Sequence, residues 1–339
     1  MTKTIAVYGA TGHTGRFVVA ELVRQGFTPI VSGRNAETLK AEWPDFEARP
    51  ATADDSHALD AALIGVDAVI NTAGPFALTG GAVSAAAVRA GIPYVDVAAE
   101  IEANVDTFAA HRDATTPIVP AMAFYGGLGD LLVSAALGDR TSADEVIVAY
   151  GLSSWHPTPG TRIAGQISHD RRNGRRVRFA DGELQYHDDQ PSQEDWPFPE
   201  PLSTRRVVKE FTMADVVTIP SHVTVPKLRT AMTLEAAGDL AGADTPAPKA
   251  VDELGRSDQT FVVDVLIRTP DGDLRATAHG QDIYAITAPL AVGAVRRLLA
   301  GEGRTTGVAS AGAMFDPADF LAELAPYLTV TIASSTNGS

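Results

Sequence analysis

Three regularly spaced glycines follow the first apolar run of the chain and could bind a phosphate group. The run Ile5–Tyr8 stops at Gly9, and Gly12 and Gly15 follow at intervals of three residues. Apolar residues then recur at helical spacing over Phe17–Val23. Glycines after a strand let the backbone turn tightly and approach a pyrophosphate, and the N-terminus of the following helix favours the anion. The pattern predicts a nucleotide site here, the alternative being a glycine turn without a ligand.

The same turn carries polar side chains that could donate hydrogen bonds to a phosphate. They are Thr11, His13 and Thr14. Hydroxyl and imidazole groups close to a pyrophosphate would add to the donors of the helix N-terminus. For His13 a second interpretation is equally open, namely a solvated histidine of an ordinary loop.

The end of the second predicted strand carries the residue that should choose between two nicotinamide cofactors. The strand Pro29–Ser32 ends at Gly33 and Arg34, and no Asp or Glu lies within Ile30–Asn35. In a doubly wound sheet a carboxylate at this point holds the ribose 2′-hydroxyl of NAD, whereas an arginine accommodates the 2′-phosphate of NADP. We therefore predict a 2′-phosphate contact for Arg34, the alternative being an exposed arginine at a strand end. Its expected neighbours in this contact are Ser32, Gly33 and Asn35.

Two further segments follow strands of the same predicted sheet and should face the cofactor. Asp54 lies where the third strand gives way to a helix, near the expected adenine pocket. A helix N-cap would explain this aspartate equally well. The segment Asn71–Phe76 follows the fourth strand, at the carboxyl edge of the sheet along which cofactors lie in this fold. Its residues expected beside the ribose and nicotinamide are Ala73, Gly74, Pro75 and Phe76.

Hydride transfer from a nicotinamide often needs a proton donor, and one tyrosine is placed to supply it. Tyr125 precedes Gly126 and Gly127, just after the last strand of the first half. It would enter a cleft between two domains or, alternatively, pack as an aromatic residue at their joint. Asp96 and Glu100 follow the fifth strand at the same edge, where a structural role in capping a helix or holding the loop is the alternative.

A run of arginines in the second half of the chain could bind a carboxylate group. Its members are Arg171, Arg172, Arg175, Arg176 and Arg178. They flank Asn173-Gly174, a pair typical of hairpin turns, so a solvated hairpin is the alternative. His156, His169 and His187 are too scattered along the chain to indicate a metal site, and we expect none. Two catalytic patterns are absent from the sequence, Tyr-x-x-x-Lys and Gly-x-Ser-x-Gly.

The order of predicted elements divides the chain into two domains and a tail. Strands and helices alternate over residues 1–125 and the strands are continuous apolar runs, which indicates a doubly wound parallel sheet. Over residues 126–285, hairpin signals such as Asp181-Gly182 and Asp271-Gly272 predict an α+β domain with a mixed or antiparallel sheet. Residues 286–339 carry two helices that should pack back on the first domain.

Four segments of the second domain have a definite predicted conformation. Asn173-Gly174 should form a hairpin turn between polar strands. Gln190–Pro201 carries four prolines and should form a surface loop. Ser221–Val225 has the composition of a strand, and Asp239–Asp258 is small and polar, as expected of a loop.

Length and composition limit the classes of protein that remain. The chain has 339 residues, a length that suits two domains, and 45% of them are hydrophobic. A net charge of −15 opposes binding to nucleic acids or anionic membranes, and the absence of cysteine excludes disulfides and thiolate chemistry. No apolar stretch reaches the roughly 18 residues of a transmembrane helix, and the N-terminus lacks the apolar region of a signal peptide. We expect a cytoplasmic protein that acts on a small molecule.

Four segments in their order along the chain resemble a known family. They are GATGHTG, SGRN, NTAGPF and YVDVAAE. Together they resemble the saccharopine dehydrogenase-type NADP-binding family. The stretch AFYGGLGDLL and the tail segments YAITAPLAVGA and FDPADFL are similar to its bacterial branch. The resemblance covers Thr2 to about Leu137 and the tail, but it is poor over Ala149–Arg256, which should hold the substrate.

The resemblance implies an NADP(H)-dependent oxidoreductase with an N-terminal Rossmann domain. The reaction it implies is hydride transfer to or from the C=N bond of a small imine or secondary amine. Since the family also includes enzymes similar to trans-acting enoyl reductases, reduction of an activated C=C bond is one alternative. A non-catalytic NADP-sensing protein is another. We expect a homodimer formed through the second sheet.

Overall fold

The first sheet of the protein has six parallel strands in the order β3-β2-β1-β4-β5-β6. The computed structural model describes residues 2–333 of the chain. The strands are β1 (Thr4–Tyr8), β2 (Thr28–Gly33), β3 (Glu47–Pro50), β4 (Ala68–Asn71), β5 (Tyr94–Asp96) and β6 (Ile118–Val119). The apolar run of β4 is buried throughout, as expected for a strand covered on both faces. This sheet confirms the predicted doubly wound domain of the Rossmann type.

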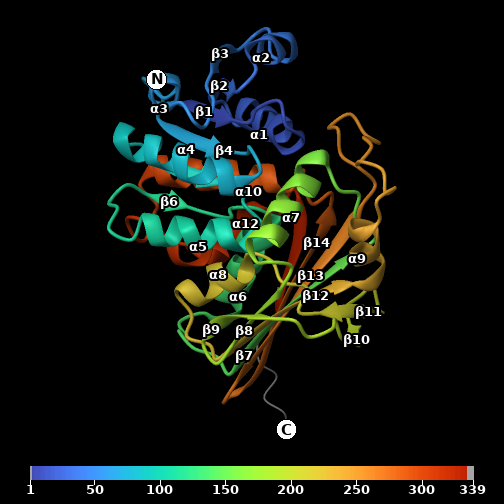
Figure 1. The fold of residues 1–339 in the computed structure, drawn as a ribbon. Coiled ribbons are helices and arrows are strands. Elements are labelled where there is room, and N and C mark those ends of the chain that lie inside the picture. The colour runs from blue at the N-terminus through green and yellow to red at the C-terminus, as the bar shows by residue number, and fades with distance from the viewer. Residues whose placement is uncertain (1, 334–339) are drawn as a thin grey trace.

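Five helices connect these strands and cover the sheet (Figure 1). They are α1 (His13–Arg24), α2 (Ala36–Glu42), α3 (Ser56–Ala62), α4 (Phe76–Ala90) and α5 (Ile101–Ala110). Helices α3, α4 and α5 pack side by side, while α1 packs against a helix from the far end of the chain. Helix α4 ends at Gly91, whose φ of 68° is readily adopted by glycine at a helix C-cap.

The second sheet has nine strands and a mixed arrangement, which confirms the predicted α+β architecture. Its strands are β7 (Glu145–Leu152), β8 (Arg176–Ala180), β9 (Glu183–His187), β10 (Gln193–Pro197), β11 (Thr204–Lys209), β12 (Lys227–Thr233), β13 (Thr260–Thr269), β14 (Gly272–Gln281) and β15 (Leu328–Ala333). The central strand β7 pairs in parallel with β12 and antiparallel with β13. The predicted tight turn Asp181-Gly182 joins β8 to β9, whereas Pro270-Asp271 joins β13 to β14, because Gly272 already belongs to β14.

Helical segments lie between and after these strands. They are η1 (Phe124–Leu128), α6 (Gly129–Leu137), α7 (Pro159–Arg171), α8 (Asp215–Thr218), η2 (Ile219–Ser221), α9 (Leu234–Ala241), α10 (Thr287–Ala300), α11 (Ala311–Met314) and α12 (Pro317–Glu323). Helix α10 packs on α1, β4 and β5 of the first domain, and α12 packs on α6. The chain then returns to the second sheet, where β15 pairs with β14. The tail therefore contacts both domains. No helix within residues 2–333 is long and apolar enough to span a bilayer.

One apolar core continues from the first sheet into the second. It contains Ile5 and Val19 of the first domain, Leu290 of α10, and Tyr150 and Val265 of the second sheet, all fully buried. The other face of the first sheet has a separate core beneath α3 and α4. Because the two sheets share the larger core, they pack directly against each other and are not separated by a linker.

The structure corrects the prediction of a hairpin at Asn173-Gly174. These residues follow α7 and adopt φ values of 54° and 75° before β8 begins. Helix α7 was not predicted, although Thr158 caps it by accepting a hydrogen bond from Thr161 N–H. Asn-Gly suits both situations, because a hairpin turn and a helix C-terminus alike need a left-handed backbone.

Three other segments of the second domain also differ from the prediction. The stretch Gln190–Pro201 contains β10, which lies at the edge of its sheet, where a proline is tolerated. The expected strand Ser221–Val225 is irregular, and β12 begins only at Lys227. The expected loop Asp239–Asp258 starts inside α9 and becomes irregular from Gly242.

A buried acid holds α6 against the C-terminal segment. Asp130 of α6 is fully buried, and its two oxygens accept hydrogen bonds from Gly312 N–H and His222 Nε2, both at 2.7 Å. Burial alone would lower the pKa of His222, but the charge and hydrogen bond of Asp130 raise it above the ordinary value. The protonated imidazole is therefore the partner that keeps the buried carboxylate stable.

We predict that His222→Asn lowers the free energy of unfolding at pH 6 by about 1.5–3 kcal/mol, the usual contribution of a hydrogen bond to a charged group. Because the pKa of His222 is raised in the folded state, this stabilisation is complete below the unfolded-state pKa and is lost as the pH rises through the folded-state pKa. Urea denaturation of both proteins at pH 6 and pH 9 checks this. An equal difference at the two pH values would contradict it.

Candidate functional site: a cleft between the two sheets

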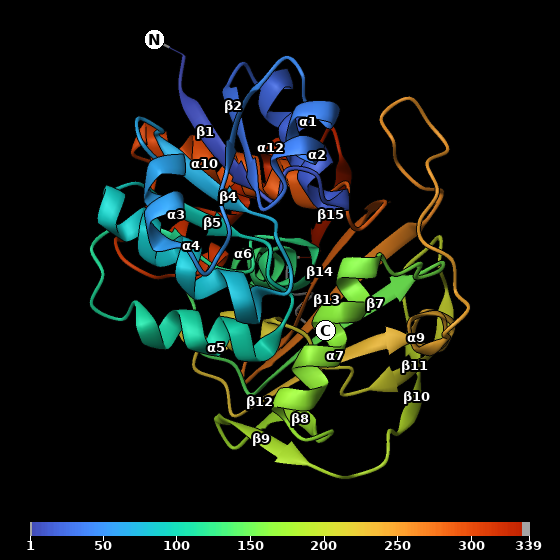
Figure 2. The same ribbon diagram turned by 45° about the horizontal axis from the view of Figure 1, so that its top comes forward.

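A cleft of about 2060 Å³ joins the glycine turn of the first domain to the second sheet. Helix α7 forms one side of it and contacts both α4 and α5 of the first domain. Figure 2 shows α7 between these helices and the strands of the second sheet. The cleft is therefore built from both domains.

The three glycines of the turn that lines the cleft differ in how closely the protein surrounds them. Gly9 has a φ of 92°, and a Cβ there would lie 2.7 Å from Ala73 N. A Cβ on Gly15 would collide with the carbonyl oxygen of Gly9. At Gly12, however, φ is −71° and the nearest atom to a Cβ is Gly9 O at 3.1 Å. The fold thus requires glycine at positions 9 and 15, whereas at position 12 a Cβ would crowd only the carbonyl oxygen of Gly9 and would otherwise project into open space.

That space lies at the N-terminus of α1 and fits a pyrophosphate. Gly12 is the N-cap of α1, no side chain caps the helix, and its first turn holds no acidic residue. The first N–H groups of a helix have no partner within it, and they attract anions. A ligand phosphate would lie where a side chain at position 12 would project.

Twelve of the fifteen residues predicted to bind the cofactor line the cleft. They are Gly9, Thr11, Gly12, His13, Thr14, Gly33, Arg34, Asp54, Ala73, Gly74, Pro75 and Phe76. The other three have structural roles. Gly15 packs beneath Gly9, Ser32 Oγ donates a hydrogen bond to Arg49 O at 2.7 Å, and Asn35 caps α2 by accepting one from Thr38 N–H.

Arg34 and Asp54 lie at the adenosine end that the sequence predicts. Arg34 is exposed and makes no hydrogen bond or ion pair with any other residue in the described part of the chain. Its guanidinium is therefore free to meet an external anion. The N-cap of α3 is Asp55 and not Asp54. The pKa of Asp54 is lowered mainly by a hydrogen bond from the Thr52 side chain.

His13 packs between the two domains. Its ring lies edge-on to Phe17 at 5.3 Å and to Tyr284 at 5.0 Å, and its Nε2 atom is buried without a partner. Burial lowers the pKa of His13, so the imidazole is neutral near pH 7. Tyr284 in turn accepts a hydrogen bond from Trp155 Nε1 at 3.2 Å. No sequence pattern points to Tyr284 or Trp155 here, because each comes from a segment remote from the glycine turn.

Tyr125 lines the cleft and lies on the η1 turn, where the first domain passes into the second. Its ring stacks on Trp155 at 5.2 Å, and its hydroxyl is buried without a hydrogen-bond partner. Burial, together with the charges of Tyr284 and Asp215, raises the pKa of Tyr125 well above its ordinary value. The phenol therefore keeps its proton, and none of the described residues accepts a hydrogen bond from it.

A fully buried pair, Asp215 of α8 and Tyr150 of β7, lies next to the η1 turn. Tyr150 OH donates to Asp215, with oxygen–oxygen distances of 2.8 and 2.9 Å. Burial raises the pKa of Asp215 to about 6, against the opposing effect of this hydrogen bond. Thr218 Oγ1 also donates to Gly126 O in the turn, at 3.2 Å. These groups come from α8 and β7 and fix the backbone that carries Tyr125.

The two acidic residues after β5 have different positions. Asp96 is buried outside the cleft lining, and it accepts hydrogen bonds from Ala98 N–H, Ala121 N–H and Tyr94 OH. Glu100 lines the cleft and accepts one hydrogen bond, from Phe76 N–H at 3.0 Å. Burial raises the pKa of the Glu100 carboxyl.

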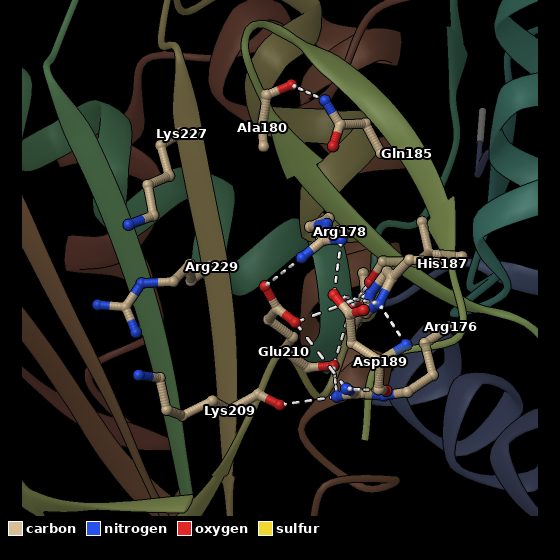
Figure 3. Close-up of polar contacts among 12 residues, drawn as sticks. Arg176, Arg178, Ala180, Gln185, His187, Asp189, Lys209, Glu210, Lys227 and Arg229 are labelled. Carbon is tan, nitrogen blue, oxygen red and sulfur yellow. Dashed lines mark hydrogen bonds and ion pairs between the residues drawn. The ribbon is translucent and has the colours of Figure 1, made fainter. Parts of the chain in front are cut away.

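The side chains of the arginine run contact other protein groups, and Arg172 and Arg176 also line the cleft. Figure 3 shows Arg176 and Arg178 turned toward protein groups. Arg176 donates to the carbonyl oxygens of Lys209 and Glu210 at 2.9 and 3.1 Å, and Arg178 pairs with Asp189 at 2.8 Å. Of the other members, Arg171 pairs with Asp106, Arg172 lies 3.6 Å from Glu102, and Arg175 lies over the ring of Tyr186.

The histidines of the second domain are also separate from one another. His169 lines the cleft, whereas His156 lies beside a small neighbouring cavity with Ser257 and Gln259. Within residues 2–333, no three His, Asp or Glu side chains are grouped closely enough to hold a metal ion.

Comparison with known proteins identifies the first domain. The family model described as "Saccharopine dehydrogenase NADP binding domain" matches residues 5–120. This part of the chain is therefore an NADP-binding domain of that type, and NADP(H) is its cofactor. A protein of Caenorhabditis elegans described as "Lipid droplet localized protein" is 32% identical over 111 residues. That match covers 28% of this chain and 26% of the relative, about a quarter of its length.

One solved structure extends the likeness over the whole fold. It is the apo histidine-tagged saccharopine dehydrogenase (L-Glu forming) from Saccharomyces cerevisiae, with a TM-score of 0.65. The alignment covers 98% of this chain and 100% of the yeast chain at 13% sequence identity. The likeness establishes a shared fold for the two domains, including the segment where the sequence resemblance is poor.

We predict that Gly12→Val weakens NADPH binding by about 100-fold or more while the protein stays folded. The reason is that a side chain meets only Gly9 O within the protein but would project into the phosphate position. Fluorescence titration with NADPH and thermal melting measure the two effects. Gly15→Val is the matched control, and it should lose folding because its side chain collides with the turn itself. Unchanged NADPH affinity in Gly12→Val would remove the pyrophosphate from this turn.

Proposed function

We propose that the protein is an NADP(H)-dependent oxidoreductase that transfers hydride to or from the C=N bond of a small imine or secondary amine. The observation that carries the proposal is the continuity of the cleft, which leads from the glycine turn at Gly12 to Tyr125 and Trp155. A dinucleotide extending along the carboxyl edge of the first sheet would bring its nicotinamide to this second end. The likeness to the saccharopine dehydrogenase family supports the choice of a C=N bond.

The chain's own residues would bind the cofactor, exclude water and supply a proton. The N-terminus of α1 would hold the pyrophosphate, and Arg34 would hold the 2′-phosphate. When bound, the nicotinamide supplies or accepts the hydride at the substrate carbon. Tyr125 would donate its proton to the substrate nitrogen, so that hydride and proton together convert C=N to CH–NH. Trp155 stacks on the Tyr125 ring and shields this end of the cleft from water.

Glu100 is a second group that could move the proton. It lies in the cleft, and its pKa is raised by burial, which favours the protonated form that a general acid needs. Tyr125 differs in having no partner for its hydroxyl, whereas Glu100 already accepts a hydrogen bond from Phe76 N–H. For this reason we assign the proton transfer to Tyr125.

Reduction of an activated C=C bond is the second candidate function. It is favoured by the aromatic character of the reacting end, where Phe124, Tyr125 and Trp155 surround the space. Such a wall accommodates a neutral enoyl group, which needs no charged partner. The two reactions differ in the atom that receives the proton, which is nitrogen in the first case and carbon in the second.

Consumption of NADPH with defined acceptors tests the proposal. A cyclic imine such as pyrroline represents C=N, and crotonyl-CoA represents an activated C=C bond. Turnover of the imine alone supports the first function, and turnover of the enoyl thioester alone replaces it with the second. Tight NADPH binding without oxidation by either class would favour a cofactor sensor. A cytoplasmic location and a homodimer stay predictions, and size-exclusion chromatography with light scattering tests the dimer.

We predict that Tyr125→Phe lowers the turnover number by about 100-fold or more, because the variant keeps the ring packing but loses the proton. NADPH affinity and melting temperature should stay within a few-fold and a few degrees, since the hydroxyl has no partner in the protein. Glu100→Gln is the matched variant, and its turnover should fall less. If the ranking of the two variants is reversed, Glu100 is the proton donor.

We predict that Arg34→Ala weakens NADPH binding by roughly 10- to 150-fold, the effect of one hydrogen bond to a charged group. NADH binding should hardly change, because NADH lacks the 2′-phosphate. Dissociation constants for both cofactors, measured in one buffer, give the comparison. The NADPH preference of the wild type should also weaken with added salt, since Arg34 is exposed. Equal losses for the two cofactors would count against the assigned contact.

A further inference from the structure

The cleft of about 2060 Å³ extends past the glycine turn and the reacting end. Beyond Trp155 it continues between α7 on one side and the end of β11 with α9 on the other. We call this part the distal arm, and its apolar lining consists of Val208, Phe211, Met213, Leu234, Ala237 and Leu240.

An aromatic wall connects the reacting end with the distal arm. Tyr125 stacks on Trp155 at 5.2 Å, and the Trp155 ring lies 6.0 Å from that of Phe211. The Trp155 backbone N–H donates to Asp239 of α9 at 2.9 Å, which fixes the indole beside that helix. A chain attached to a group at Tyr125 would therefore follow a continuous apolar surface into the arm.

Several charged groups near the distal arm contact other protein groups, although Arg172 Nε and Arg178 Nε are buried without a hydrogen-bond partner. Arg162 donates to the carbonyl oxygens of Gly242 and Thr245 at 3.0 and 2.9 Å. Arg176 donates to the backbone, as described above. Glu210 has Arg176, Arg178 and His187 around its carboxylate, at distances of 3.7–4.0 Å (Figure 3). Arg172 is held less closely, 3.4 Å from Ser168 Oγ and 3.6 Å from Glu102.

We propose that the distal arm binds a neutral alkyl or aryl chain of the substrate, which places the reducible bond beside Tyr125. The proposal rests on the proposed function for the position of the reacting bond only. Leu234 is 37% exposed in the arm, so a ligand chain would cover apolar surface that now faces water. Arg162 and Arg176 already donate to backbone carbonyl oxygens, so binding a charged group to either of them would first break those hydrogen bonds.

The chain length of a probe sets a quantitative expectation. Burying one methylene group contributes about 0.8 kcal/mol, so the affinity should rise about fourfold for each CH₂ that enters the arm. The probes are primary alcohols from butanol to decanol, titrated calorimetrically into the full chain saturated with NADPH. The NADPH titration of the same sample reports separately on the cofactor site. A normal NADPH site with no dependence on chain length overturns the distal arm and leaves the proposed function standing.

Two alanine variants decide where the alcohols bind. Ala237→Asp places a carboxylate in the arm and should reduce decanol affinity by at least about 100-fold, since an unpaired charge against an alkyl chain is strongly unfavourable. Ala109→Asp makes the same change on the exposed side of α5, outside the cleft lining, and should leave decanol binding unchanged. NADPH affinity should be retained in both variants. Equal loss, or no loss, in the two variants would mean that decanol binds elsewhere.

Decanoate distinguishes a neutral chain from an anionic one. We expect decanoate to bind more weakly than decanol, and Arg172→Met to leave both affinities nearly unchanged. If decanoate instead binds tenfold more tightly and Arg172→Met removes that advantage, the arm recognises a carboxylate and the proposal of a neutral chain is wrong.

Discussion

The η1 turn Phe124–Leu128 is the constraint on which the rest of the structure depends, because the two sheets meet there. Gly126 has a φ of 95°, and a Cβ there would lie 2.8 Å from the Cβ of Ala121. A left-handed residue in such a confined place is accessible to glycine at little cost. The buried Tyr150–Asp215 pair and Thr218 hold the turn from the second domain. Tyr125 can therefore point into the cleft only if both domains are packed correctly.

Buried acids hold the junction between the domains, and each has its own donors. Asp96 secures the segment that leads to the η1 turn through backbone N–H groups, and Asp215 supports that turn through a phenol. Asp130 uses an imidazole and a backbone N–H to bind the C-terminal segment. A buried carboxylate without donors would be strongly destabilising. The network therefore favours one relative placement of the two domains, and with it one shape of the cleft.

Helix α7 connects the two ends of the cleft. Its C-terminal end is tied to α5 through Ser168, Arg171 and Arg172, which meet Glu102 and Asp106. Its N-terminal end is tied to Tyr284, which packs against His13 of the glycine turn. The cofactor end and the substrate end are thus joined by one helix. His13 of the glycine turn contacts Tyr284, and Tyr284 contacts Trp155 at the reacting end.

The sequence alone determined the first domain and most of its ligand contacts. A glycine turn between a strand and a helix is a local structure, so Gly9, Gly12 and Arg34 could be placed from their neighbours in the chain. The sheet order and the NADP-binding character followed from the same local pattern. Local patterns failed where one signal suits two structures, as for Asn173-Gly174, which ends α7 and does not form a hairpin.

Only the tertiary structure decided which groups surround the reacting end. Trp155, Asp215 and Tyr284 lie far from Tyr125 in the chain, and no local periodicity links them. The pairing of Arg176 was equally hidden, because carbonyl oxygens accept its hydrogen bonds and every residue has a carbonyl oxygen. The sequence gives the chemistry of each side chain. Whether that side chain finds a hydrogen-bond partner depends on packing between segments that are distant in the chain.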